Sequence, residues 1–162
     1  MDAKTGAIAA LRMSRGILNQ LIADFPADKA AFQPAPTDNH LLWMLGHMPY
    51  GYVYFASILG GTVTEPPESW KPLFSAGSKP EPDAKKYPSV AEMKKVFDST
   101  FEEFMAIVEK MSAEDLGKAP AIPAAWLPDR LAALHAVVWH EGWHGGQLAN
   151  VRKALGLPKI MG

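Results

Sequence analysis

Four stretches of the chain repeat hydrophobic residues with the period of an α-helix, and no stretch shows the strict alternation of a half-buried β-strand. The predicted helices span about residues 4–25, 39–59, 89–111 and 129–155. In the first of them, Ile8, Leu11, Leu18 and Leu21 fall near one face. Amphipathic helices of this kind bury their apolar faces against one another. The pattern therefore predicts an all-α fold.

Residues with known preferences at helix ends support these boundaries. Pro26 ends the first predicted helix, because proline cannot continue the backbone hydrogen-bond pattern. Thr37 or Asp38 can cap the start of the second helix with a side-chain oxygen. At the start of the third helix, Ser89 and Glu92 have the spacing of a capping box, in which each side chain satisfies the other residue's free amide.

Two long connections separate the predicted helices. Residues 62–88 hold six of the fourteen prolines, so we expect an ordered loop there rather than a regular element. A loop of that length in a compact domain often forms a lid or a wall of a site. The second connection covers residues 117–129. Together these features predict an antiparallel four-helix bundle with long crossover loops, formed by residues 1–162 as a single domain.

Composition narrows the chemistry that such a bundle can carry. The 162 residues include no cysteine, which excludes disulfides, thiolate metal ligands and a cysteine nucleophile. The formal net charge is −1 and there is no long basic run, so we expect neither nucleic acid nor an anionic membrane as a partner. The sequence shows no signal-peptide pattern and no apolar stretch long enough to span a membrane, which favours a cytoplasmic protein.

The segment HEGWHGGQ, residues 140–147, contains the H-E-x-x-H pattern of zinc proteases. His140 and His144 are one helical turn apart, so their rings project from one face and can share an ion. Zinc proteases take a third ligand downstream, but Asn150 stands where one class has histidine. No Asp, Glu, His or Cys follows His144 at all. A metalloprotease with Glu141 as its base is therefore the least favoured alternative.

An upstream histidine can complete the site instead. His47 lies within the apolar and aromatic segment LLWMLGHMPYGYVYF. Burying an imidazole without a partner costs on the order of 1–3 kcal/mol, and a metal ion would remove that cost. A hydrogen bond to a neighbouring carbonyl is the alternative. The predicted metal ligands are His47, His140 and His144, whereas we expect ordinary core or surface roles for His40 and His135.

Three further residues are candidates for the surroundings of the metal. Glu141 is the candidate catalytic residue, either as a general base or as a partner of a ligand, and it can face the ion or point to solvent. Tyr50 and Tyr54 follow His47 by one and two helical turns and can line a pocket for a cofactor or substrate. Aromatic residues at this spacing are also typical of a helical core.

Glycines inside the fourth predicted helix are a separate signal. They are Gly142, Gly145 and Gly146. Each costs roughly 1 kcal/mol relative to alanine within a helix. We interpret this cost as a sign that a neighbouring backbone or a ligand approaches closely, and we therefore expect a crowded site.

Three segments of the chain carry a resemblance to a known family. They are LLWMLGHM after Asn39, the H-x-x-x-H-x-G-Q pattern of residues 140–147, and the R-x-x-L-G-x-P pattern of residues 152–158. In these features, and in the spacing of its four helices, the chain resembles the DinB/YfiT-like superfamily. One departure is visible, since many members have arginine directly after the last histidine and this chain has Gly145.

The resemblance implies a four-helix bundle with a divalent metal held by His47, His140 and His144. It also implies a homodimer. Characterised relatives include thiol-dependent transferases and isomerases, in which a low-molecular-weight thiol is activated at the metal. Other relatives have no assigned reaction.

The chemistry of the ligand set leads to the same function class. Three neutral imidazoles leave a divalent ion its full charge and open positions for water or substrate. Such an ion lowers the pKa of a bound water or thiol by several units. The leading hypothesis is a metal-dependent transferase or hydrolase that acts on a small molecule, with zinc or nickel as the metal. The alternative is a non-catalytic, metal-stabilised module for ligand binding or stress response, which the aromatic second helix and Trp126 suit equally well.

Overall fold

The computed structural model describes residues 2–160, and all regular elements within them are helical. The long helices are α1 (Ala3–Ala23), α2 (Leu41–Leu59), α4 (Val90–Lys110) and α6 (Arg130–Ala154). The short ones are α3 (Lys71–Phe74) and α5 (Ala113–Leu116), with 3-10 turns at Ala27–Lys29, Glu68–Trp70 and Ala84–Lys86. The predicted all-α bundle is confirmed, and each long helix begins and ends within two residues of its predicted limits.

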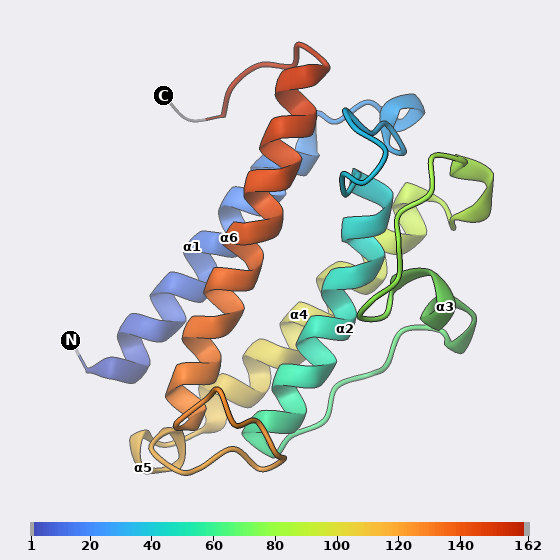
Figure 1. Ribbon diagram of the computed structural model, residues 1–162. Coiled ribbons are helices and arrows are strands. Elements are labelled where there is room, and N and C mark those ends of the chain that lie inside the picture. The colour runs from blue at the N-terminus through green and yellow to red at the C-terminus, as the bar shows by residue number, and fades with distance from the viewer. Residues whose placement is uncertain (1, 161–162) are drawn as a thin grey trace.

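The four long helices form two pairs that run in opposite directions (Figure 1). Helices α1 and α6 run in one direction and pack together, while α2 and α4 run in the other and also pack together. Contact between α6 and α2 joins the two pairs. The connection of residues 60–89 crosses the length of the bundle, which is why consecutive long helices α2 and α4 are parallel.

Side chains at the helix starts differ in part from the sequence-based expectation. The cap of α2 is His40 and not Thr37 or Asp38, because its ring Nδ1 accepts from the amide of Trp43 at 3.1 Å. Ser89 caps α4 as predicted, with its Oγ accepting from the amide of Glu92 at 3.2 Å. Among the described residues, the amide of Ser89 donates no return bond to the Glu92 carboxylate, so the predicted capping box is half formed.

Helix α2 lies at the centre of the core. It is apolar on almost all sides, and thirteen of its nineteen residues are buried. It contacts α4, α6 and α3, so other helices cover most of its surface. This placement leaves His47 only partly exposed. Among residues 2–160, no helix is long and apolar enough to cross a membrane.

The long connection after α2 forms a wall against that helix. Contrary to the expectation of a loop without elements, it contains α3 and two 3-10 turns. Phe74 at the end of α3 is fully buried against Gly46, and a Cβ at position 46 would overlap the Phe74 ring. The absence of a side chain at Gly46 therefore lets α3 lie directly on α2, one residue from His47.

Candidate metal centre

The three predicted ligands, His47, His140 and His144, lie together. One ring nitrogen from each is within 4.8 Å of the other two. The Nε2 atoms of His140 and His144 are 3.1 Å apart, and the ring centroid of His47 lies 5.5 and 5.1 Å from theirs. Helix α2 supplies the first histidine and α6 the other two, so the contact between these helices assembles the group.

Hydrogen bonds on the far side of two rings fix their orientation. His47 Nδ1 donates to the carbonyl oxygen of Phe74 at 2.8 Å, since a carbonyl can only accept. His144 Nδ1 bonds to Oε1 of Gln147 at 2.9 Å, and the same oxygen accepts from Asn39 Nδ2 at 3.0 Å. With the proton on Nδ1, each ring presents an Nε2 lone pair to the group, which is the form that binds a metal.

A hydrogen bond from His47 to a neighbouring carbonyl was expected as an alternative to metal binding. The structure shows that one ring can make this hydrogen bond and still bind a metal ion. An imidazole has two nitrogens, and His47 uses Nδ1 for Phe74 while Nε2 stays available. In metal sites, such bonds orient the ligand and raise its basicity.

Close packing holds the remaining ring, that of His140, against α2. A Cβ on Gly51 would lie 2.9 Å from Cε1 of His140, a separation that real Cβ atoms do not adopt. The missing side chain at Gly51 therefore provides the space that the ring occupies. On the other side of the group, the indole of Trp43 stacks on His47 with the ring centroids 4.3 Å apart.

Burial keeps the three imidazoles neutral. Burial and, to a smaller extent, the neighbouring His47 together lower the pKa of His140 to about 4. Burial also lowers the pKa of His144 to about 3, with contributions from His140 and His47 against the bond to Gln147. The pKa of His47 is also lowered by burial, against the effect of the Phe74 carbonyl. At neutral pH all three rings are therefore free bases.

The donor set fits a divalent transition-metal ion. Two nitrogens bound to one zinc ion at about 2.0–2.1 Å can be no more than about 4.2 Å apart, and the 3.1 Å between His140 and His144 meets this limit. Without a cation or a shared proton, two Nε2 lone pairs at this distance repel each other. Imidazole nitrogen suits zinc, copper, iron and nickel.

Glu141 lies outside the histidine group, neither facing the ion position nor pointing to solvent as expected. Its carboxylate is 1% exposed and accepts from Tyr52 at 2.6 Å and from the hydroxyl of Ser14. Arg15 donates to the Tyr52 oxygen at 3.1 Å and to Asp98 at 2.7 Å. Burial raises the pKa of Glu141, and its hydrogen bonds oppose that shift. This polar network joins α1, α2, α4 and α6.

The other candidate residues fall in different places. The hydroxyl of Tyr50 is buried and has no hydrogen-bond partner among the described residues, and burial raises its pKa. Tyr54 is exposed and packs edge-on against Phe55. His40 is fully buried with both ring nitrogens bonded, and His135 is exposed, in agreement with the ordinary roles expected of them.

Several residues of the centre were not found from the sequence. The helix-interior glycines Gly46 and Gly51 were the available signal, because each carries the same conformational cost as the glycines of the fourth predicted helix. The close approach of a neighbouring backbone, expected as one explanation of these glycines, was wrong at Gly142 and Gly146, since no atom lies within 4 Å of a Cβ built there. Gly145 alone among the three meets neighbours, at 3.3 Å from Leu18.

Comparison with known proteins supports the fold and identifies a family for the chain. A solved structure titled as the conserved protein of a locus from Enterococcus faecalis matches with a TM-score of 0.66. The match covers 94% of this chain and 96% of that one at 15% sequence identity, a level that shows the fold alone. No curated protein matches the sequence. The sequence matches the DinB superfamily over residues 10–148, which include all three histidines, and the chain therefore belongs to that superfamily.

Proposed function

We propose that the protein is a metal-dependent enzyme that acts on a small molecule, with a divalent ion held by His47, His140 and His144. The observation that carries the proposal is the convergence of three neutral imidazoles from two helices. No carboxylate belongs to this group within the described residues, so the protein would leave the charge of the ion undiminished.

A divalent ion in such a site supplies Lewis acidity, which lowers the pKa of a water or thiol at an open position. The protein's own residues orient and shield that position. Phe74 and Gln147 hold two of the imidazoles in the required tautomer. Trp43 and Phe55, whose rings lie beside the histidines, supply apolar surface that strengthens electrostatic effects at the site.

The reaction class is a thiol-dependent transfer or a hydrolysis, with zinc or nickel as the metal. The choice rests on the superfamily membership. Because the chain has no cysteine, a thiol that takes part in the reaction would come from solution. Tyr50 and Tyr54 stay candidates for contacts with the cofactor or substrate. For Glu141, the buried network supports a positioning role between α6, α1 and α2 more than a role as a general base.

Metal analysis tests the centre itself. Protein purified without a histidine tag after growth in metal-replete medium should contain about one equivalent of zinc or nickel per chain. His47→Ala should lose the metal, whereas His135→Ala, a change of an exposed histidine on α6, should keep it. A wild-type content below roughly a tenth of an equivalent of any divalent metal would contradict the proposal.

Turnover assays test catalysis. Low-molecular-weight thiols are offered together with electrophiles, and hydrolysis of activated esters and amides is measured in parallel. Activity should be lost in His47→Ala and retained in His135→Ala. Metal binding without turnover would favour the alternative of a non-catalytic, metal-stabilised module, and turnover that survives His47→Ala would rule out the metal mechanism.

We also propose that the enzyme is a cytoplasmic homodimer. Trp139 and Trp143 of α6 pack on each other yet are 61% and 56% exposed, and Met13 of α1, the helix that packs against α6, is also exposed. Exposed apolar side chains in a group often mark an interface. Analytical ultracentrifugation should show a dimer for the wild type. The double variant Trp139→Ser and Trp143→Ser should be a monomer. The control Trp126→Ser, which changes an exposed tryptophan outside the helices, should leave the dimer intact.

A further inference from the structure

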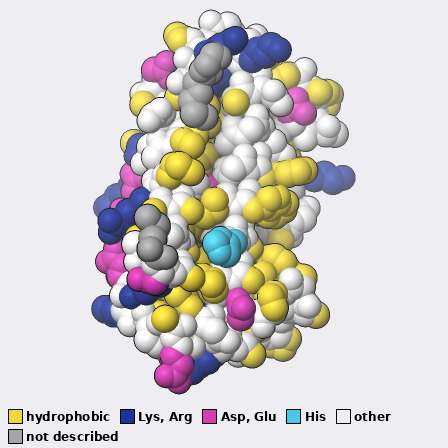
Figure 2. All heavy atoms as spheres, turned by 90° about the vertical axis from the view of Figure 1, so that its left-hand side faces the viewer, with side chains coloured by type: hydrophobic (Ala, Val, Ile, Leu, Met, Phe, Trp, Pro, Cys, Tyr) yellow, Lys and Arg dark blue, Asp and Glu magenta, His cyan; other side chains and the backbone are white. Residues whose placement is uncertain are grey.

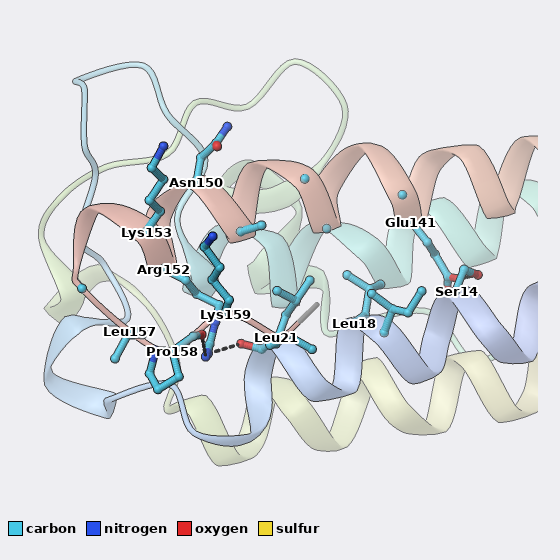
Figure 3. A pocket seen from close by; sticks show the side chains of 17 residues that line it. Ser14, Leu18, Leu21, Glu141, Asn150, Arg152, Lys153, Leu157, Pro158 and Lys159 are labelled. Carbon is cyan, nitrogen blue, oxygen red and sulfur yellow. Dashed lines mark hydrogen bonds between the residues drawn. The ribbon is translucent and has the colours of Figure 1, made fainter. Parts of the chain in front are cut away.

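A second concave surface lies between α6 and α1, whereas the histidines lie between α6 and α2. It is a groove of about 650 Å³, within the size range of small-molecule pockets. Leu18 and Leu21 of α1 form an apolar wall, and Leu157 and Pro158 beyond α6 close one end (Figure 3). None of the three histidines lines this groove.

The end wall of the groove is held in place by a buried arginine. Arg152 donates to the carbonyl of Leu21 at 2.9 Å and to the carbonyl of Pro158 at 3.0 Å, as the dashed lines in Figure 3 show. It also pairs with Asp24, whose oxygens lie 2.5 and 3.1 Å from the guanidinium. These hydrogen bonds fix the segment after α6 to the end of α1, so the closed end of the groove is formed by an ordered segment.

Two glycines of α6 make the groove deeper. Gly142 and Gly146 are one turn apart, both line the groove, and a Cβ at either position would meet no atom within 4 Å. These residues carry the helix cost of glycine without allowing a close helix contact. Because no neighbouring side chain or backbone uses the space, a bound molecule can occupy it.

The two ends of the groove differ in the charge of the side chains that line them. Lys153 and Lys159 lie at the closed end, and among the described residues neither has a carboxylate within ion-pair distance. Arg152 is already paired with Asp24. The opposite end is bounded by Glu141, whose buried carboxylate is bonded to other side chains. An anionic group is therefore favoured at the lysines and disfavoured near Glu141, about 18 Å away along α6.

We propose that this groove binds a small amphipathic anion of the type of a medium-chain carboxylate. Its apolar body lies along Leu18, Gly142 and Gly146, and its acidic group lies at Lys153 and Lys159. The site goes beyond the proposed metal chemistry and is independent of it, since it lies on the other side of α6.

A second copy of the chain suits the groove less well. The residues that would anchor another copy, Trp139 and Trp143, lie on α6 but do not line the groove. Figure 2 shows hydrophobic side chains along the middle of the face that carries α1 and α6, with basic side chains at its upper end. An apolar strip that ends in positive charge matches a molecule with one acidic end.

Titration calorimetry of the full chain with dodecanoate tests the site. We expect one molecule to bind per chain, and dodecyltrimethylammonium, with the same apolar chain and a positive end, to bind at least about ten times more weakly. Gly146→Leu fills the groove and should weaken dodecanoate binding at least about tenfold. The control Gly16→Leu places the same side chain in open space on α1, outside the groove, and should have no effect.

Charge reversal gives a second set of variants. Lys153→Glu with Lys159→Glu should weaken dodecanoate binding and reduce the preference over the cationic probe. Lys95→Glu, which reverses the charge of an exposed residue on α4, should change neither the affinity for dodecanoate nor the preference over the cationic probe. Circular dichroism and metal content are measured for each variant, so that loss of the fold or of the metal centre is separated from loss of the groove.

Each other outcome overturns the proposal. Failure of dodecanoate to bind wild type, or equal affinity for wild type, Gly146→Leu and the double lysine variant, contradicts it. If dodecanoate does not bind and Gly146→Leu dissociates a wild-type dimer, the groove is an interface between copies. Neither result affects the metal proposal, which fails only if metal or turnover is absent.

Discussion

The two sides of α6 use helix-interior glycine in opposite ways. On the α2 side, Gly46 and Gly51 remove side chains where Phe74 and His140 need the space, and the result is a tightly packed metal centre. On the α1 side, Gly145 packs closely against Leu18, but at Gly142 and Gly146 no other residue takes the space of the missing side chain, and the result there is a groove. A glycine inside a helix therefore indicates either a close contact with a neighbouring element or an open space beside the helix. Which of the two applies depends on where the neighbouring element lies.

The electrostatic properties of the two sides also differ. The histidine side buries three bases that stay neutral, because charging them would require desolvation without a partner. The groove side ends in two lysines that remain accessible to solvent. A cation is thus suited to the first side and an anion to the second. The predictions below separate the two sides, beginning with the largest expected effect.

The metal-free protein should lose stability as the pH falls below about 6.5. The folded pKa of His140 is about 4, below its unfolded value, so the unfolded chain binds more protons in this window and its free energy falls. Between pH 7 and pH 5 the loss should be on the order of 2 kcal/mol from this residue alone, with more from His144. Urea unfolding at pH 7 and pH 5 measures it, and His140→Gln should flatten the dependence. If His135→Gln reduced the pH dependence of the unfolding free energy as much as His140→Gln does, the dependence would not come from the buried histidines.

Gly46→Ala should be the most destabilising single change on the α2 side. The new Cβ overlaps the Phe74 ring, and overpacking of this kind typically costs about 1–3 kcal/mol. Because the Phe74 carbonyl orients His47, metal affinity should fall as well. Thermal unfolding and a metal-chelator competition measure the two effects. Unchanged values of both would show that α3 does not support the centre.

Glu141→Gln should cost on the order of 1 kcal/mol, because glutamine retains one acceptor for Tyr52 or Ser14 but not both. We expect metal content to be unchanged and turnover to fall by less than about tenfold, the effect of slight misplacement. A general base would instead contribute about 10²–10⁴-fold. If turnover fell by that factor while the free energy of unfolding was unchanged, Glu141 would be the general base that the sequence suggested.

Gly142→Ala should have the smallest effect and the opposite sign. A Cβ there meets no neighbour, so the change should stabilise the protein by about 0.5–1 kcal/mol through the unfolded chain and the helix. A rise in melting temperature of roughly 1–4 °C is expected for a chain of this size. The same substitution at Gly51 should lower it, and equal shifts at the two positions would refute the contrast between the two sides.

Much of the candidate site could be predicted from local sequence features. His140 and His144 share a helix, so their spacing alone brings the rings together, and His47 stood out as an isolated polar residue in an apolar helix. The position of Glu141 could not be predicted in the same way. A residue next to a ligand on a helix points about 100° away from it, and the direction toward Ser14 and Tyr52 depends on where α1 and α2 lie.

The sequence by itself determined the four helices, their limits within two residues and the three histidines, because hydrophobic period, end preferences and ligand chemistry are carried by residues close together in the chain. Only the tertiary structure decided that Phe74 and Gln147 orient the imidazoles, that Gly51 admits His140, and that α6 has a filled side and an open side. Those features depend on the rotation and separation of helices that are distant in sequence, which no local pattern specifies.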